Sequence, residues 1–267
     1  MMDEKFGDFV TSFMVVALGS KELHVNYPPS LAQDLLDSAT TKVISLKLIE
    51  WADMGSYIRQ DDWNIELDGI IQLIDLRVLE LQTPIVRDFI FEMLLLFLQQ
   101  EHDQMSVVKD IVVSFLIRVG PRVIVALLGI RTTIGCIENR LPPRPSELLE
   151  AFDKPHKILT GSKLSVGARA LSKHFHRGTE GWWGASKGND DSKNLSAHVF
   201  CEKIIKEAVW INLHQIVGGV NIVEYRVREG YGARWALVDH NITPQVCLFR
   251  GFLEPHCLDG HDKGWRH

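Results

Sequence analysis

The spacing of hydrophobic residues changes along the chain, from helical in the first half to alternating near the end. The clearest helical pattern lies in residues 65–81, where hydrophobic residues recur at intervals of three and four: Leu67, Ile70, Ile71, Ile74, Val78 and Leu81. Thr83-Pro84 then supplies a cap and a proline at the first position of a second helix. That helix is hydrophobic on almost every side as far as Phe97, which predicts a place in the middle of a helical stack.

Two further hydrophobic segments, 107–119 and 123–130, are separated by Gly120-Pro121 and predict two buried helices. A membrane span is not expected here, because Arg118 and Arg122 lie at the centre of the run. Each charge there would cost about 2.5–3.5 kcal/mol. Residues 30–135 therefore predict four to six helices of similar length, as a bundle or as an armadillo/HEAT-like stack without a fixed repeat.

Strict alternation begins after residue 220. Residues 222–228 place Val223 and Tyr225 on one face of a strand and Glu224 and Arg226 on the other. A glycine-containing turn at 229–232 leads to strands at 233–238 and 246–253, so a three-stranded antiparallel meander is expected.

Two helices are expected before the meander. A basic helix occupies much of the segment 163–177, and a longer helix runs from Asn194 to about Gln215. The overall expectation is an α+β protein with a mostly helical bundle (1–140), a proline-containing linker and short helix (141–160), and an α+β C-terminal unit (161–267).

Composition narrows the functional classes only slightly. The 267 residues carry a net charge of −5, which argues against binding nucleic acid through bulk charge but leaves a local basic patch open. The four cysteines are scattered, and the acidic N-terminus lacks the order of a secretory signal. We therefore expect reduced thiols and a cytoplasmic or nuclear location.

One candidate site is the charged face of the meander. Guanidinium groups match phosphate oxygens, and four arginines are expected on this face together with two basic residues of the preceding helix: Arg226, Arg228, Arg234, Arg250, Arg169 and Lys173. Three aromatic residues, Trp182, Trp183 and Tyr231, would then stack on bases or rings. The alternative is an ordinary sheet surface, on which the arginines pair with Glu224 and Glu254.

A second candidate is a histidine held by a carboxylate. Glu207 and His214 are seven residues apart and would share one face of the predicted helix 194–215, as would His198 and Glu202, four apart. Such a pair has the composition of a general base. The alternative is a polar helix face whose groups satisfy one another and water.

The third candidate is a zinc site in the tail. Imidazole and thiolate are zinc ligands. The tail carries His256, Cys257, His261 and His267, with Cys247 and His240 upstream, and Cys257 and His261 have usable spacing. A single close pair of ligands is weaker than the two pairs typical of zinc sites. The alternative is a tail whose side chains hydrogen-bond to the surface.

No common catalytic signature occurs in the sequence. The first interpretation is therefore a non-catalytic intracellular scaffold that binds a protein partner through its stacked helices. Two alternatives stay open. One is a module that binds phosphate, a nucleotide or RNA through the arginines, and the other is an enzyme that depends on a C-terminal histidine or on zinc.

Overall fold

A computed structural model describes most of the chain: residues 4–54, 74–99, 105–133, 135–156, 163–175, 181–184, 187–238 and 246–255. The chain divides into two compact units. Unit 1 comprises Met1–Asp61, Leu73–Thr132 and Ile137–Leu141, and unit 2 comprises Asp62–Gln72, Thr133–Cys136 and Pro142–His267. The expected division into separate domains at residue 140 stays a prediction.

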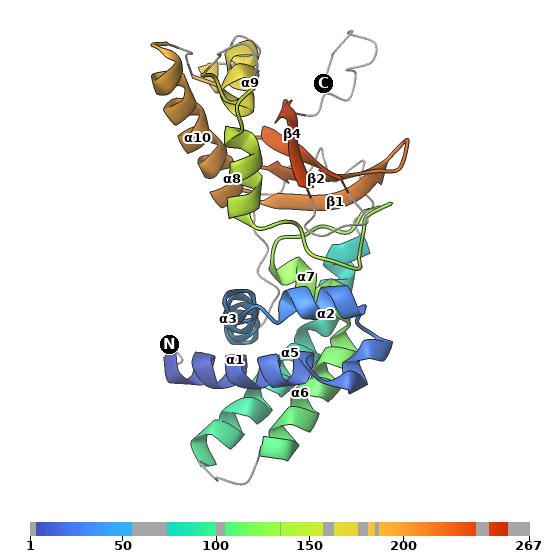
Figure 1. Ribbon diagram of the computed structural model, residues 1–267. Coiled ribbons are helices and arrows are strands. Elements are labelled where there is room, and N and C mark those ends of the chain that lie inside the picture. The colour runs from blue at the N-terminus through green and yellow to red at the C-terminus, as the bar shows by residue number, and fades with distance from the viewer. Residues whose placement is uncertain are drawn as a thin grey trace. The chain divides into compact units, whose positions relative to one another are not determined.

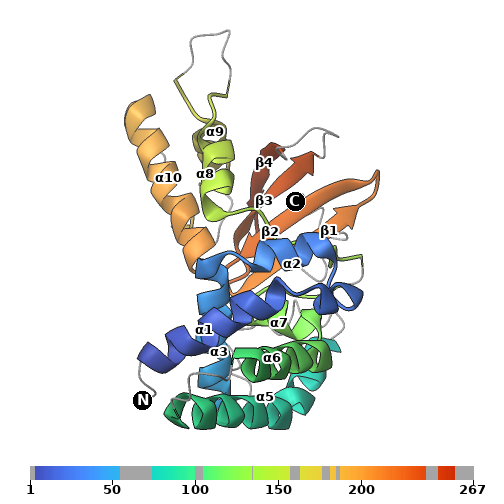
Figure 2. The same cartoon turned by 60° about the horizontal axis from the view of Figure 1, so that its bottom comes forward.

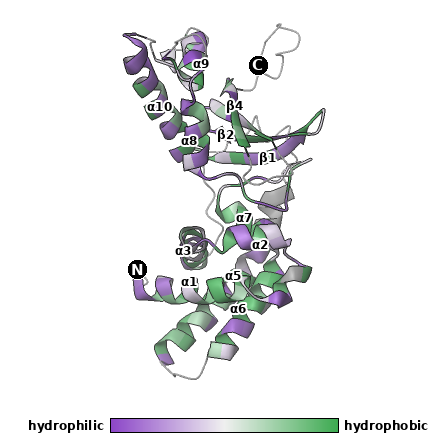
Figure 3. Cartoon of the chain, viewed as in Figure 1, coloured by the Kyte–Doolittle hydropathy of each residue, from purple (hydrophilic) through white to green (hydrophobic). Residues whose placement is uncertain are grey.

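Unit 1 is helical (Figure 1). Its described elements are α1 (Glu4–Leu18), the 3-10 helix η1 (Lys21–Val25), α2 (Pro29–Leu35), α3 (Ser38–Met54), α5 (Ile74–Gln99), α6 (Met105–Val119) and α7 (Pro121–Leu127). Figure 3 shows α1, α5 and α6 as mostly hydrophobic. Their buried sides form one core, in which the rings of Phe89 and Phe115 stack with centroids 3.9 Å apart.

The helices of unit 1 differ from the expectation in length and in one boundary. They range from 7 to 26 residues rather than being similar, and the armadillo/HEAT-like alternative stays a prediction. The helix expected to begin at Thr83-Pro84 is instead the continuation of α5, which contains Pro84 in its interior. Thr83 is not a cap, because it lies in the interior of α5, where its Oγ1 accepts a 3.0 Å hydrogen bond from Nε1 of Trp51 on α3. The predicted residues 65–73 lie outside the described residues.

The break between α6 and α7 is confirmed. Gly120 adopts a φ of 77°, a left-handed conformation that glycine tolerates best, and Pro121 occupies the first position of α7. Among the residues that the structure describes, no helix is long and hydrophobic enough to cross a membrane.

Unit 2 places helices on one face of a sheet (Figure 2). The helices are α8 (Pro145–Asp153), α9 (Val166–His174) and α10 (Asp190–Lys206). The described strands are β1 (Trp210–Ile216), β2 (Val220–Arg226), β3 (Gly232–Val238) and β4 (Val246–Leu253), an antiparallel meander in the order β1-β2-β3-β4. Trp235 on β3 links the sheet to the helical layer, because its Nε1 donates a 3.0 Å hydrogen bond to the main-chain oxygen of Leu148 on α8.

The α+β class is confirmed, but two details of the C-terminal unit were wrong. The helix predicted over 194–215 ends at Lys206, and residues 210–216 form a strand that adds a fourth member to the expected three-stranded meander. The hydrophobic residues of 194–215 continue a helical spacing. However, the Val-Trp-Ile run at 209–211 favours a strand, and pairing with β2 satisfies its backbone.

Candidate functional site

The face of the sheet opposite the helices carries a group of polar side chains. Strand pairing places Asn212 opposite Glu224 and Glu224 opposite Arg234, so a carboxylate on the central strand β2 lies between β1 and β3 partners. Because side chains alternate along a strand, His214 on β1 and Arg226 on β2 share this face. We call His214, Glu224, Arg226 and Arg234 the polar cluster.

Arg226 is buried and held on several sides. Its Nη1 donates to the main-chain oxygens of Gly230 (2.8 Å) and Glu254 (3.1 Å), and its Nη2 lies 3.5 Å from Oε2 of Glu224. The guanidinium also lies over the Trp210 ring, 5.9 Å from its centroid. Burial lowers the pKa of Arg226, and the adjacent Glu224 carboxylate opposes that shift. Arg226 thus orients Glu224 rather than offering a free fork to a ligand.

Gly232 on β3 makes this packing of Arg226 feasible. It lies opposite Arg226 on the neighbouring strand, and a Cβ built on it would overlap the main-chain oxygen of Tyr225 and meet Cγ of Arg226 at 2.9 Å. The absence of a side chain therefore lets the Arg226 stem lie flat against the sheet.

His214 is the titratable ring of the cluster. Its side chain is half-buried, and its buried Nδ1 makes no hydrogen bond to any described residue. Burial lowers the pKa of His214 below the ordinary value of 6.5. The Glu224 carboxylate acts in the opposite direction, while the Arg234 and Arg226 cations lower it further. The ring is therefore neutral at neutral pH and has a carboxylate near enough to stabilise its protonated form.

The segment before α8 borders the outer edge of β1. Cys136 forms an isolated antiparallel β-bridge with His214, and the main-chain N–H of Gln215 donates to the main-chain oxygen of Gly135 at 3.1 Å. Asn212 Nδ2 donates to the Thr133 hydroxyl at 3.1 Å. These contacts fix the backbone on either side of His214.

The structure brings only part of the predicted anion site together. Arg226 and Arg234 belong to the polar cluster, and Arg250 is exposed on β4 at a position that alternates with buried Cys247 and Phe249. Arg228 is exposed in the turn after β2. Two other members are elsewhere: Arg169 and Lys173 are exposed on α9, in the helical layer that covers the opposite face of the sheet.

The three aromatic residues pack against one another inside unit 2. Trp182 stacks on Tyr231 with centroids 4.1 Å apart, and Trp183 meets both rings at close to right angles. Trp183 is 2% exposed and Tyr231 is 4% exposed. The ring faces that were expected to stack on bases are thus occupied by other side chains.

Sequence reasoning missed two contacts of the Glu254 carboxylate. Trp183 Nε1 donates to both carboxylate oxygens of Glu254 at 3.1 Å, and His174 Nδ1 lies 2.9 Å from Oε1 of the same carboxylate. All three side chains are buried. They are 71 and 80 residues apart in sequence, so no local spacing indicates the contact.

The predicted helix-face pairing of Glu207 with His214 was wrong. Glu207 is the C-cap of α10 and His214 lies on β1, because the helix ends at Lys206. His198 does lie on α10, but its Nδ1 contacts Asp153 Oδ2 at 2.7 Å, while Glu202 is exposed. Of these residues, His214 alone belongs to the polar cluster.

The predicted zinc ligands His256, Cys257 and His261 lie outside the described residues, as does His240. Cys247 is described, and its side chain is buried. Within the described ranges, no group of three or more His, Cys, Asp or Glu side chains is arranged to hold a metal ion.

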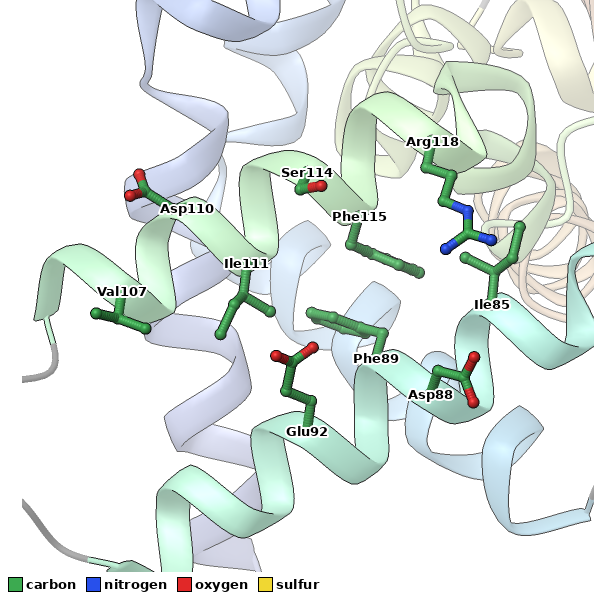
Figure 4. Close-up of a pocket in the computed structure, with 10 residues that line it drawn as sticks. All are labelled: Ile85, Asp88, Phe89, Glu92, Val107, Asp110, Ile111, Ser114, Phe115 and Arg118. Carbon is green, nitrogen blue, oxygen red and sulfur yellow. The ribbon is translucent and has the colours of Figure 1, made fainter.

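A groove in unit 1 is a separate concave feature (Figure 4). Its volume is about 430 Å³ and it lies between α5 and α6, with the stacked Phe89 and Phe115 at its floor. Three carboxylates and one arginine line it: Asp88, Glu92, Asp110 and Arg118. The excess of negative charge disfavours phosphate groups there, so the groove is a poor nucleic-acid site.

The polar face of unit 2 combines a neutral histidine, a carboxylate and arginines, a set typical of enzymes that act on phosphate esters. The comparisons point the same way. Residues 153–254 match the family described as CdiA C-terminal tRNase toxin domain. The matched segment contains α9, α10 and all four described strands, although it is less than half of the chain. No curated protein matches the chain, and no solved structure does.

The match overturns the first interpretation of the sequence. A similarity to a tRNA-cleaving toxin domain is incompatible with a non-catalytic scaffold whose main role is protein–protein interaction, so that interpretation was wrong. It agrees better with the alternatives of RNA binding through arginines and of histidine-dependent catalysis. A site assembled across several strands leaves no short sequence motif, so the lack of familiar motifs does not exclude an enzyme.

Proposed function

We propose that unit 2 is a ribonuclease that cleaves tRNA and acts as a toxin in the cell where it does so. The family match supports the substrate, and the polar cluster supports the chemistry. The observation that carries the proposal is the strand register, which places the half-buried His214 on the same face of the sheet as Glu224 and Arg234. tRNA works in the cytoplasm, so this proposal favours a cytoplasmic site of action, and the nuclear alternative loses its basis.

In this proposal His214 is the general base. Its neutral ring removes the proton from a ribose 2′-hydroxyl, and the resulting O2′ attacks the adjacent phosphorus. The O2′–P bond forms as the P–O5′ bond breaks, which leaves a 2′,3′-cyclic phosphate and a 5′-hydroxyl. The departing O5′ takes a proton from water, and the imidazolium later returns its proton to solvent. Glu224 stabilises the imidazolium while it exists, as the direction of its effect on the His214 pKa implies.

Arg234 is the proposed phosphate ligand. Unlike Arg226, it is only partly buried, and its charge is near enough to lower the pKa of His214. A guanidinium there would offset the negative charge that develops on the phosphate oxygens in the transition state. The exposed Arg250 on β4 would contact the substrate backbone further along the same face. Local arginines would thus bind tRNA despite the net charge of −5.

The decisive experiment incubates the purified full chain with total tRNA and resolves the products on a denaturing gel. The wild type should release fragments that end in a 2′,3′-cyclic phosphate, and His214→Gln should lower the rate by about 10²- to 10⁴-fold. His198→Gln is the matched control, because it alters a histidine on α10 outside the polar cluster and should cleave normally. Intact tRNA with the wild type, or equal rates for wild type and His214→Gln, would overturn the proposal.

A further inference from the structure

A second, buried group of side chains lies next to the polar cluster and contacts it through Arg226. That group consists of Glu254, just after β4, with His174 from α9 and Trp183 from the 181–184 segment. The Glu254 carboxylate is bonded on both oxygens, and His174 and Trp183 are also in ring contact with centroids 5.4 Å apart. We call these three residues the clamp.

The clamp reaches the polar cluster through the backbone of Glu254. While the Glu254 side chain is held by His174 and Trp183, its main-chain oxygen accepts a 3.1 Å hydrogen bond from Nη1 of Arg226. The other side of the same guanidinium lies 3.5 Å from the Glu224 carboxylate. A continuous set of contacts therefore runs from α9, through Glu254 and Arg226, to Glu224.

The burial of these groups requires a structural reason. A carboxylate that is 8% exposed and a guanidinium that is 9% exposed are costly to remove from water unless hydrogen bonds and ion pairs offset much of that cost. Glu254 and Arg226 do not form a side-chain pair with each other among the interactions described. Each has separate partners, and the main-chain oxygen of Glu254 joins the two sets, although Nε of Arg226 makes no hydrogen bond to a described residue. This arrangement gives Arg226 one orientation rather than several.

We infer that His174, Trp183 and Glu254 are positioning residues for the ribonuclease site, and that they act by fixing Arg226 and hence Glu224 beside His214. This inference rests on the proposed function for the reaction concerned. None of the three side chains belongs to the polar face, and none contacts the substrate in this scheme. Loss of the clamp should therefore affect the reaction step more than the binding of tRNA, because a displacement of about 1 Å at a catalytic group can cost about 10²-fold in rate.

The first test is a kinetic comparison of Glu254→Gln with the wild type on tRNA. Glu254→Gln keeps the main-chain oxygen but replaces the carboxylate, which accepts the hydrogen bonds from His174 and Trp183, with a neutral amide. We expect kcat to fall on the order of 10- to 100-fold while KM changes by less than about 2-fold. Glu202→Gln, which alters an exposed carboxylate on α10, is the matched control and should match the wild type.

A double-mutant cycle separates positioning from a merely structural role. If the clamp acts through Glu224, then Glu254→Gln should reduce kcat far less in a Glu224→Gln background than in the wild-type background. Equal losses in both backgrounds would overturn the inference, as would an unchanged kcat in a folded Glu254→Gln chain. Should Glu254→Gln fail to fold, Trp183→Phe decides by the same cycle, because it keeps an aromatic ring at this position while it removes the N–H donor.

A measurement without activity distinguishes failure of the inference from failure of the proposed function. NMR titration of the His214 ring reports the arrangement of Glu224 and Arg226 around it. Glu254→Gln and Trp183→Phe should each change the His214 pKa, whereas Glu202→Gln should not. A wild type that leaves tRNA intact but shows these changes would overturn the ribonuclease and retain the clamp. Unchanged titration in both variants would overturn the clamp itself.

Discussion

Glu224 and Arg234 face each other across β2 and β3, and their opposite charges act on the pKa of His214 in opposite directions. Burial of the ring is the largest cause of its lowered pKa, the carboxylate opposes this shift, and the guanidinium adds to it. The charges of Glu224 and Arg234 therefore partly offset each other at His214.

Two substitutions should move the His214 pKa in opposite directions. Glu224→Gln removes the charge that raises it, so the pKa should fall further, whereas Arg234→Gln removes a charge that lowers it, so the pKa should rise. NMR titration of the His214 ring, assigned by comparison with His214→Gln, measures both. Shifts of the same sign in the two variants would contradict the arrangement of charges.

The same histidine should make stability depend on pH. Its folded-state pKa lies below the ordinary value of 6.5, so between those two values the unfolded chain binds more protons than the folded one. The free energy of unfolding therefore rises with pH through this window and falls as the solution is acidified below about 6.5. Urea unfolding at about pH 7.5 and about pH 5.5 should show a larger loss for the wild type than for His214→Gln. Identical losses would mean that the ring is not desolvated.

Gly232→Ala should disturb Arg226 directly. The added methyl group would overlap the main-chain oxygen of Tyr225 and crowd the Arg226 stem, so the strand pairing must shift. We expect a loss of about 1–3 kcal/mol in the free energy of unfolding, by analogy with overpacked sites, together with a fall in tRNA cleavage. Denaturant unfolding and the gel assay measure the two effects. Gly218→Ala, in the β1–β2 turn at a φ of 92°, gives a comparison in which backbone strain acts without crowding.

Trp235→Phe should weaken the attachment of α8 to the sheet. The phenyl ring retains most of the packing with Tyr225 and Phe249, but the main-chain oxygen of Leu148 loses its donor. Loss of one hydrogen bond typically costs about 0.5–1.5 kcal/mol, so the free energy of unfolding should fall by at least that amount. A midpoint equal to that of the wild type would show that this hydrogen bond contributes nothing.

Arg234→Ala and Arg250→Ala should weaken tRNA binding through loss of phosphate contacts. Each variant should reduce the salt dependence of affinity by about one unit of slope on a double-logarithmic plot. Filter binding at several salt concentrations, done in the inactive His214→Gln background, measures this. Arg169→Ala on α9 is the matched control, because its guanidinium is exposed in the helical layer and should leave the slope unchanged.

Local patterns in the sequence determined much of the helical and sheet architecture. The hydrophobic spacing of 107–119 and 123–130, with Gly120-Pro121 between them, predicted α6 and α7, and the alternation after residue 220 predicted β2, β3 and β4. These elements were predictable because their periodicity, turns and caps lie within a few residues of one another. The charged face of the meander followed from the same alternation, and it correctly placed Glu224 and Arg226 together.

Tertiary structure decided between a helix and a strand for residues 210–216, and with β1 it completed the site. The residues from Trp210 to Ile216 form a strand because β2 supplies their backbone partners. His214 therefore lies on β1 in the polar cluster and not on the predicted helix. The clamp is decided in the same way, since His174, Trp183 and Glu254 meet only after α9 packs against β4. Contacts between residues 71 or 80 positions apart depend on packing of the whole unit, which no local pattern of residues encodes.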